Sequence, residues 1–208
     1  HALTGDETHL ESARSIAKFM CTDLPQLPQQ DDTVCFAYSP EDRRRVHNAN
    51  LLVAQHLIQT APLTGDETFQ EAAEPALAFS LTRQRESGAW PYGEHAPEEP
   101  YEAGLMQLVD HHHTGFVLRA LHGIQSVHPR NDVQAALKHG FQYYRKLFSN
   151  LGMPYNAYAR YPVDIHACAE GILCPTVLSD TFIAGKHIAS LTLRWTHWFL
   201  RDEQTGAP

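Results

Sequence analysis

A six-residue string, LTGDET, occurs twice in this chain, at residues 3–8 and again at residues 63–68. An identical string that returns after 60 positions in a chain of 208 residues indicates an internal structural repeat. Each copy opens a stretch with helical character, and each stretch leads through Gly, Pro and polar residues to an aromatic strip, at 35–38 and at 90–93. The sequence therefore predicts helical hairpins in series, with function at the place where equivalent hairpin ends converge.

Composition favours a helical, cytoplasmic protein that binds no nucleic acid and has no membrane span. The 208 residues suit a single domain, or the C-terminal part of a larger one, and 43% hydrophobic residues can fill its core. The net charge is -8, with one basic cluster at Arg43–Arg45, which argues against a nucleic-acid surface. The longest apolar runs are interrupted by His, Gln or Arg, so no transmembrane span is predicted. Four cysteines without a CxxC pattern favour a reducing compartment.

Apolar spacing predicts seven helices. The predicted spans are 6–22, a second helix that starts after Ser39–Asp42 and has its body at 50–58, then 66–84, 113–127, 132–148, 164–178 and 181–200. The start of the second helix is inferred from a cap residue, a proline and early acids. Pro75 within the third helix predicts a kink or a broken turn.

The predicted helices alternate between amphipathic and apolar nearly all round, and two concentric layers explain this alternation. Buried helices would form the inner layer and amphipathic helices the rim of an all-α protein, an α/α toroid built from helical-hairpin repeats, or a solenoid if the ring does not close. A full ring of six hairpins needs twelve helices. We therefore expect an incomplete ring, either the latter part of a toroid whose first hairpins are missing or a half-ring completed by a second copy.

Several longer motifs follow the same hairpin plan. They are QRESGAW at 84–90, YSP at 38–40, VHNAN at 46–50, GAWPYG at 88–93, HTGFVL at 113–118 and YPVDIH at 161–166. Together they resemble a bacterial prenyltransferase/squalene-cyclase-like family associated with surface-polysaccharide biosynthesis. The resemblance covers nearly the whole chain and implies the α/α toroid fold. The chain lacks the D-x-D-D element with which true cyclases protonate an isoprenoid, which argues against triterpene cyclisation.

The three apolar helices predict a shared site, because Asn48, His113 and His166 take equivalent places at their N-termini. Inner helices of one sense all start at the same mouth of the ring. The polar residues expected there are His47, Asn48, Asn50, Asp110, His111, His112, His113, Asp164 and His166. The substrate-binding wall would comprise Tyr38, Trp90, Tyr92 and Tyr161, with Arg45 just upstream. Aromatic planes beside carboxylates and imidazoles suit sugar rings.

Each of these residues also has a structural explanation. Asn48 and Asn50 are typical helix caps. His111 and His112 fit a solvated loop, and Trp90 is more often structural in such an element. The patterns alone leave these alternatives open.

Two chemistries fit the expected mouth. In acid/base catalysis, His113 or His166 would move a proton with Asp110 or Asp164 as partner, in epimerisation, elimination or transfer on a sugar. A zinc site from His113, His166, Cys168 and an Asp is the weaker hypothesis, because the spacing does not put all of them on one helix face. The positive ends of the inner helices would favour an anionic substrate such as a uronic acid or a sugar phosphate.

The sequence therefore favours an enzyme of surface-polysaccharide metabolism that binds a carbohydrate or glycosyl intermediate at this mouth. A prenyl- or terpenoid-binding toroid and a non-catalytic helical scaffold that binds protein are the alternatives. The lining of the cavity distinguishes them. Imidazoles and carboxylates indicate the first, aromatic residues alone the second, and the lack of a closed pocket the third.

Overall fold

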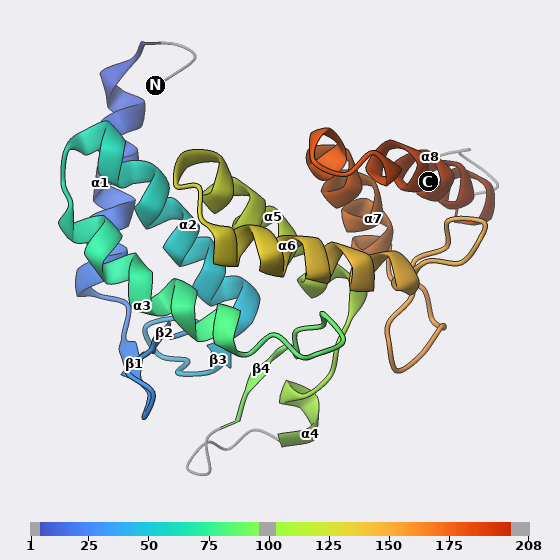
Figure 1. The fold of residues 1–208 in the computed structure, drawn as a ribbon, viewed down its shortest axis with the longest axis horizontal. Helices are drawn as coiled ribbons and strands as arrows, with labels where there is room; N and C mark the ends of the chain where they lie inside the picture. The colour runs from blue at the N-terminus through green and yellow to red at the C-terminus, as the bar shows by residue number, and fades with distance from the viewer. Residues whose placement is uncertain (1–4, 96–102, 201–208) are drawn as a thin grey trace.

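A computed structural model describes residues 5–95 and 103–200, and it is mostly helical (Figure 1). The helices are α1 (Glu7–Thr22), α2 (His47–Thr64), α3 (Thr68–Thr82), α4 (Ala103–Met106), α5 (His111–Val127), α6 (Asn131–Tyr144), α7 (Ile165–Val177) and α8 (Ala184–Phe199), with 3₁₀ turns η1 (Arg145–Leu147) and η2 (Leu178–Asp180). The strands are β1 (Gln26–Pro28), β2 (Val34–Phe36), β3 (Arg45–Val46) and β4 (Gly93–Glu94).

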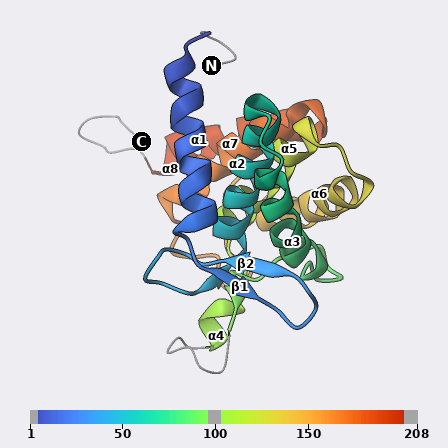
Figure 2. The ribbon, with the colours of Figure 1, turned by 90° about the vertical axis from the view of Figure 1, so that its left-hand side faces the viewer.

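The helices form an inner and an outer layer, as expected. Helix α2 packs against α3 and α5, α5 packs against α6 and α7, and α7 packs against α8. The inner layer is therefore α2, α5 and α7, and the outer helices α3, α6 and α8 each form a hairpin with the inner helix before them (Figures 1 and 2). Leu51 and Leu57 of α2 and Leu118 and Leu121 of α5 are fully buried in one core. No described helix is long and apolar enough to cross a membrane.

The repeated string forms the same turn at the start of two helices that pack against α2. Asp6 Oδ1 accepts hydrogen bonds from the Thr8 amide at 2.9 Å and the Thr8 hydroxyl at 2.7 Å. Asp66 Oδ1 accepts the same pair from Thr68, at 3.2 Å and 2.6 Å. The glycine before each aspartate has φ of 68°. The prediction that each copy opens a helix is confirmed for the described part of the repeat.

The start predicted for the second helix is wrong. The Ser39 hydroxyl accepts a hydrogen bond from the Asp42 amide, but this closes a turn and does not cap a helix. The chain then extends as β3, which pairs antiparallel with β4 through Arg45 opposite Glu94 and Val46 opposite Gly93. Because the pairing holds residues 45 and 46 in an extended conformation, α2 begins only at His47.

Three smaller differences concern the helix limits. Helix α3 continues through Pro75, so the turn is not broken there, and the alternative of a kink stays a prediction. The helix predicted over 132–148 ends at Tyr144 before a 3₁₀ turn. The structure also adds the short helix α4, which apolar spacing did not indicate.

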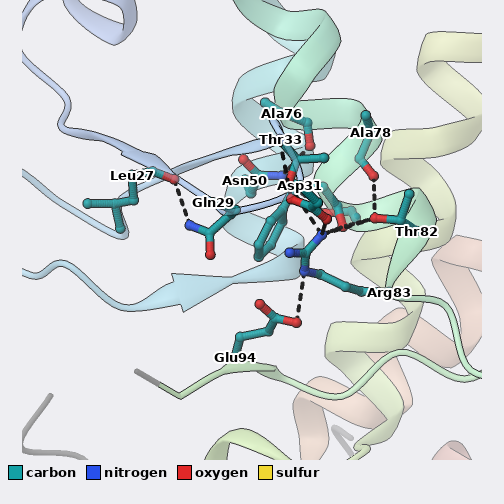
Figure 3. A network of polar contacts seen from close by, with 12 residues as sticks. Leu27, Gln29, Asp31, Thr33, Asn50, Ala76, Ala78, Thr82, Arg83 and Glu94 are labelled. Atoms are coloured by element: carbon teal, nitrogen blue, oxygen red, sulfur yellow. Dashed lines mark hydrogen bonds and ion pairs between the residues drawn. The ribbon is translucent and has the colours of Figure 1, made fainter. Parts of the chain in front are cut away.

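Arg83 ties the C-terminal end of α3 to the strands (Figure 3). Its Nη1 donates to Asp31 at 3.1 Å and to Thr33 at 3.3 Å, and its Nε lies 2.8 Å from Glu94 Oε1. The guanidinium also lies over the Phe79 ring, 4.1 Å from its centre. The Arg83 side chain thus holds the β1–β2 turn and strand β4 against the end of α3.

Trp90 joins the hairpins α2–α3 and α5–α6. It is 2% exposed, and its indole N–H donates to the Ser80 carbonyl at 2.7 Å. A Cβ added at Gly140 of α6 would lie 2.5 Å from the indole ring, so the glycine permits the close approach of that helix.

Trp90→Ala should lower the free energy of unfolding by about 3–5 kcal/mol, because it opens a cavity between two hairpins and leaves a carbonyl unpaired. Trp198→Ala is the matched control, since Trp198 is 64% exposed, and it should change stability by about 0.5 kcal/mol or less. Urea unfolding followed by circular dichroism measures both. Equal losses for the two variants would contradict this role of Trp90.

Candidate functional site

Two adjoining cavities lie where α2 and α5 begin. The larger, here called the outer chamber, has a volume of about 250 Å³. It is lined by Arg44, Tyr92, Leu105, Met106, Leu108, Asp110 and His113. The smaller, here called the inner pocket, has a volume of about 10 Å³. It is lined by His47, Asn48, Trp90, Pro91, Tyr92, Asp110, His113, Thr114 and Val117. Because Tyr92, Asp110 and His113 belong to both, the two cavities form one site, the mouth.

Asp110 caps α5 and at the same time holds the His113 ring. Its Oδ1 accepts the His113 amide at 2.8 Å, and its Oδ2 lies 2.5 Å from His113 Nδ1. Aspartate is a favoured residue at this cap position because its carboxylate satisfies amides that have no partner within the helix. Burial alone would raise the pKa of Asp110, but the hydrogen bonds from His113 outweigh it, so the pKa is lowered. The carboxylate is therefore ionised at neutral pH.

The second imidazole–carboxylate pair lies at the start of α7. Asp164 Oδ1 accepts the His166 amide at 2.8 Å and lies 2.9 Å from His166 Nδ1. The His166 side chain is 74% exposed, whereas that of His113 is 28% exposed. His112 lies between the two pairs, with its ring centre 4.1 Å from that of His113 and 6.0 Å from that of His166. Three imidazoles thus form a row from α5 to α7.

Tyr92 supplies an aromatic face to the mouth. Its ring centre lies 4.6 Å from that of His113, and burial raises the pKa of its hydroxyl, so the side chain is neutral. Arg44 also lines the outer chamber and forms an ion pair of 2.5 Å with Asp42. The mouth therefore combines an aromatic plane, a guanidinium, a carboxylate and an imidazole.

The residues that could hold a metal ion differ from those predicted. Within the described parts of the chain, ligand atoms of Asp110, His112 and His113 lie within 4.8 Å of one another. Cys168 is fully buried in α7, so the expected set of His113, His166, Cys168 and an aspartate is not gathered at one point.

Some predicted residues lie outside the mouth. Asn50 is fully buried and bonds to the Phe36 amide, the Ala76 carbonyl and the Ser80 hydroxyl, so its polar atoms do not reach the cavity. Tyr161 is 70% exposed and lines neither cavity. Tyr38 also lines neither, but its ring lies 4.7 Å below the Arg44 guanidinium.

Two further corrections concern neighbours in the sequence. Arg44 lines the outer chamber in place of Arg45, which lies in β3 opposite Glu94. In an extended segment, successive side chains point to opposite sides, so Arg44 and Arg45 face in different directions. This could not be inferred from the sequence while a helix was predicted at these residues. His111 does not lie in a solvated loop, because it is fully buried against Tyr144 and Phe148.

Two buried histidines make the stability of the fold depend on pH. Burial, reinforced by Arg83 and Arg85, lowers the pKa of His47 to about 3. Burial likewise lowers the pKa of His111 to about 3, against the attraction of Asp110. Both imidazoles are therefore neutral in the folded protein and regain an ordinary pKa of about 6.5 when it unfolds.

The free energy of unfolding should fall as pH drops below about 6.5, because the unfolded chain then binds more protons than the folded one. The expected slope is about 1.4 kcal/mol per pH unit for each of the two histidines. Urea unfolding between about pH 7 and pH 5, above the range where carboxyl groups titrate, measures it. His47→Gln and His111→Gln should each flatten the slope. An unchanged slope in both variants would show that other groups cause the dependence.

No protein-family profile and no curated protein matches the sequence. Solved structures do match the fold. A cellobiose 2-epimerase from Bacillus thermoamylovorans is 9% identical, with a TM-score of 0.70 over 99% of this chain and 58% of its own. A GH76 α-mannanase from Bacteroides thetaiotaomicron is 14% identical, with a TM-score of 0.65 over 91% of this chain and 58% of its own. An unsaturated glucuronyl hydrolase from a Bacillus species is 12% identical, with a TM-score of 0.61 over 92% of this chain and 55% of its own.

These likenesses establish the fold class as an α/α toroid, as the alternation of helices predicted. The chain spans somewhat more than half the length of the structures it matches. The expected completion of the ring by further hairpins or by a second copy stays a prediction. The cytoplasmic location likewise stays a prediction.

Proposed function

We propose that the chain belongs to a carbohydrate-active enzyme, which binds a saccharide in the mouth and moves a proton on it. The observation that carries this proposal is the pair formed by Asp110 and His113 on the wall shared by the two cavities. An oriented imidazole at a cavity is the commonest means of acid/base catalysis in proteins.

The pair assigns a role to each nitrogen of His113. Asp110 accepts the proton on Nδ1, so Nε2 carries a free lone pair and acts as the general base. When Nε2 takes a proton from the substrate, the Asp110 carboxylate stabilises the imidazolium that forms. The protonated ring can then return the proton as a general acid. Asp164 and His166 form a second pair of this kind, which fits a reaction with two proton transfers, such as epimerisation or elimination.

The shape and lining of the mouth favour a sugar. The outer chamber of about 250 Å³ is slightly smaller than the pockets of about 300–1,000 Å³ typical of small ligands, which suits a short saccharide. The apolar face of a sugar ring would stack on Tyr92, and Arg44 would bind a hydroxyl, a carboxylate or a phosphate. Neighbours that share the fold include enzymes named for mannan, cellobiose and glucuronyl substrates, which supports this substrate class.

A prenyl or terpenoid ligand, in keeping with the squalene-cyclase-like resemblance, is the second candidate. Leu105, Met106 and Leu108 give the outer chamber an apolar wall that would suit it. Such a ligand, however, would bury Arg44 and Asp110 without replacing their contacts with water, which is unfavourable. The third candidate, a scaffold that binds protein, does not explain why a carboxylate orients the His113 imidazole at a cavity.

Asp110→Asn tests the chemistry while it keeps the helix cap, because asparagine caps helices about as well as aspartate. We expect turnover of the saccharide to fall about 100- to 10,000-fold, since an amide cannot stabilise the imidazolium and no longer selects the tautomer. His113→Ala should give a loss of similar size. The assay follows the products of a saccharide panel by chromatography, together with thermal melts.

Asp6→Asn is the matched control, since Asp6 caps α1 in the same way and lines neither cavity of the mouth. It should leave turnover unchanged. A loss of turnover that merely follows a loss of melting temperature, or equal losses in Asp6→Asn and Asp110→Asn, would refute the assigned role of Asp110.

A further inference from the structure

The inner pocket contains two buried polar atoms that the proposed proton transfer does not use. His47 Nε2 and Asn48 Oδ1 are both inaccessible to solvent, and neither has a hydrogen-bond partner among the described residues. His47 is fully buried and Asn48 is 9% exposed, and both line the inner pocket beside Asp110 and His113. A buried polar atom without a hydrogen-bond partner loses its hydration at a cost in free energy, so a polar group that enters the inner pocket would bind favourably there.

A chain of hydrogen bonds through Ser80 favours one tautomer of His47. Asn50 Nδ2 donates to the Ser80 hydroxyl oxygen at 3.1 Å, and the same oxygen lies 3.2 Å from His47 Nδ1. Ser80 accepts from Asn50, and we infer that it donates its own proton to His47 Nδ1. The neutral ring then carries its proton on Nε2. Asn50 and Ser80 are thus positioning residues that act through His47.

The pocket therefore offers one donor, Nε2–H of His47, and one acceptor, Oδ1 of Asn48. A hydroxyl group is the complement of this pair, because it accepts one hydrogen bond and donates another. The volume of about 10 Å³ is close to that of a single water-sized probe, so one oxygen atom fits and a larger group does not.

We propose that the inner pocket is a specificity subsite that reads one hydroxyl group of the saccharide, next to the atom on which His113 acts. The inference rests on the proposed function of the mouth. It adds a requirement that the mouth alone does not impose, namely that a sugar lacking this one hydroxyl is rejected. Burial keeps His47 neutral, with a pKa of about 3, so the subsite works unchanged over the ordinary range of pH.

Binding of monodeoxy sugars tests the subsite. The probes are methyl cellobioside, methyl mannobioside and the full set of their monodeoxy analogues, measured by calorimetry. For whichever parent binds, one monodeoxy analogue should bind about 10- to 100-fold more weakly than the others. The missing hydroxyl group of that analogue leaves two buried groups unpaired.

The variants show whether the inner pocket causes that discrimination. Asn48→Leu removes the acceptor. It should lower the affinity for the parent sugar to that of the sensitive analogue, and it should leave the affinity for that analogue unchanged. Ser80→Ala acts outside the pocket and should give a smaller loss at the same position. His128→Gln, at the far end of α5, is the control and should keep the full discrimination.

The form of His47 can be measured without a sugar. Long-range proton–nitrogen NMR on protein with labelled histidine should show the proton of His47 on Nε2, and a shift towards the Nδ1 form in Ser80→Ala. A proton on Nδ1 in the unmodified protein would overturn the inference.

The outcomes separate the two proposals. If a sugar binds but no deoxy position is discriminated, or the discrimination persists in Asn48→Leu, the subsite is refuted and the proposed function stands. If neither sugar series nor any member of the wider saccharide panel binds, the proposed function fails and the subsite fails with it.

Discussion

The hairpin architecture and the mouth both depend on three buried hydrogen bonds made by the side chain of Asn50. Its amide oxygen accepts the Phe36 amide at 2.9 Å, and its amide nitrogen donates to the Ala76 carbonyl at 2.7 Å and to Ser80. One residue thereby links the inner helix α2, the outer helix α3 and strand β2. All three bonds are buried, so the loss of any one would leave an unpaired group without access to water. This bonding fixes the start of α2, and with it the place of His47 and Asn48.

The inner helices begin in two different ways, and the difference shapes the mouth. Helices α5 and α7 begin with Asp110 and Asp164, whose carboxylates offset the positive end of each helix and hold an imidazole. Helix α2 has no side-chain cap and begins at a strand, with His47 donating its amide to the Tyr92 carbonyl at 3.1 Å. The mouth therefore has the Asp110–His113 pair on its α5 side and the buried side chains of His47 and Asn48 on its α2 side, and the Asp164–His166 pair lies at the start of the neighbouring helix α7.

Sequence reasoning predicted the layers well because they follow from apolar periodicity, which tertiary contacts reinforce. It also gathered His47, Asn48, Trp90, Tyr92, Asp110 and His113, because residues at equivalent helix starts must meet in a hairpin array. Sequence reasoning failed where contacts between distant residues determine the limits of a helix or the surroundings of a side chain. The β3–β4 pairing delayed the start of α2 and put Arg44 in the cavity wall. The aromatic pocket around His111 is formed by Tyr144 and Phe148, which lie more than thirty residues away in the chain. No local pattern reports such contacts.

The repeated turn and the two aspartate caps differ in what they connect. The turns at Asp6 and Asp66 begin a helix, whereas Asp110 begins a helix and holds the His113 ring with the same carboxylate. The first turn of a helix opens more easily than its body, and local opening needs far less free energy than global unfolding. Each time the first turn of α5 frays, the His113 ring also loses its orientation. Amide exchange at His113 would thus report directly how often the Asp110–His113 geometry is interrupted, and heating should disturb this geometry before the core melts.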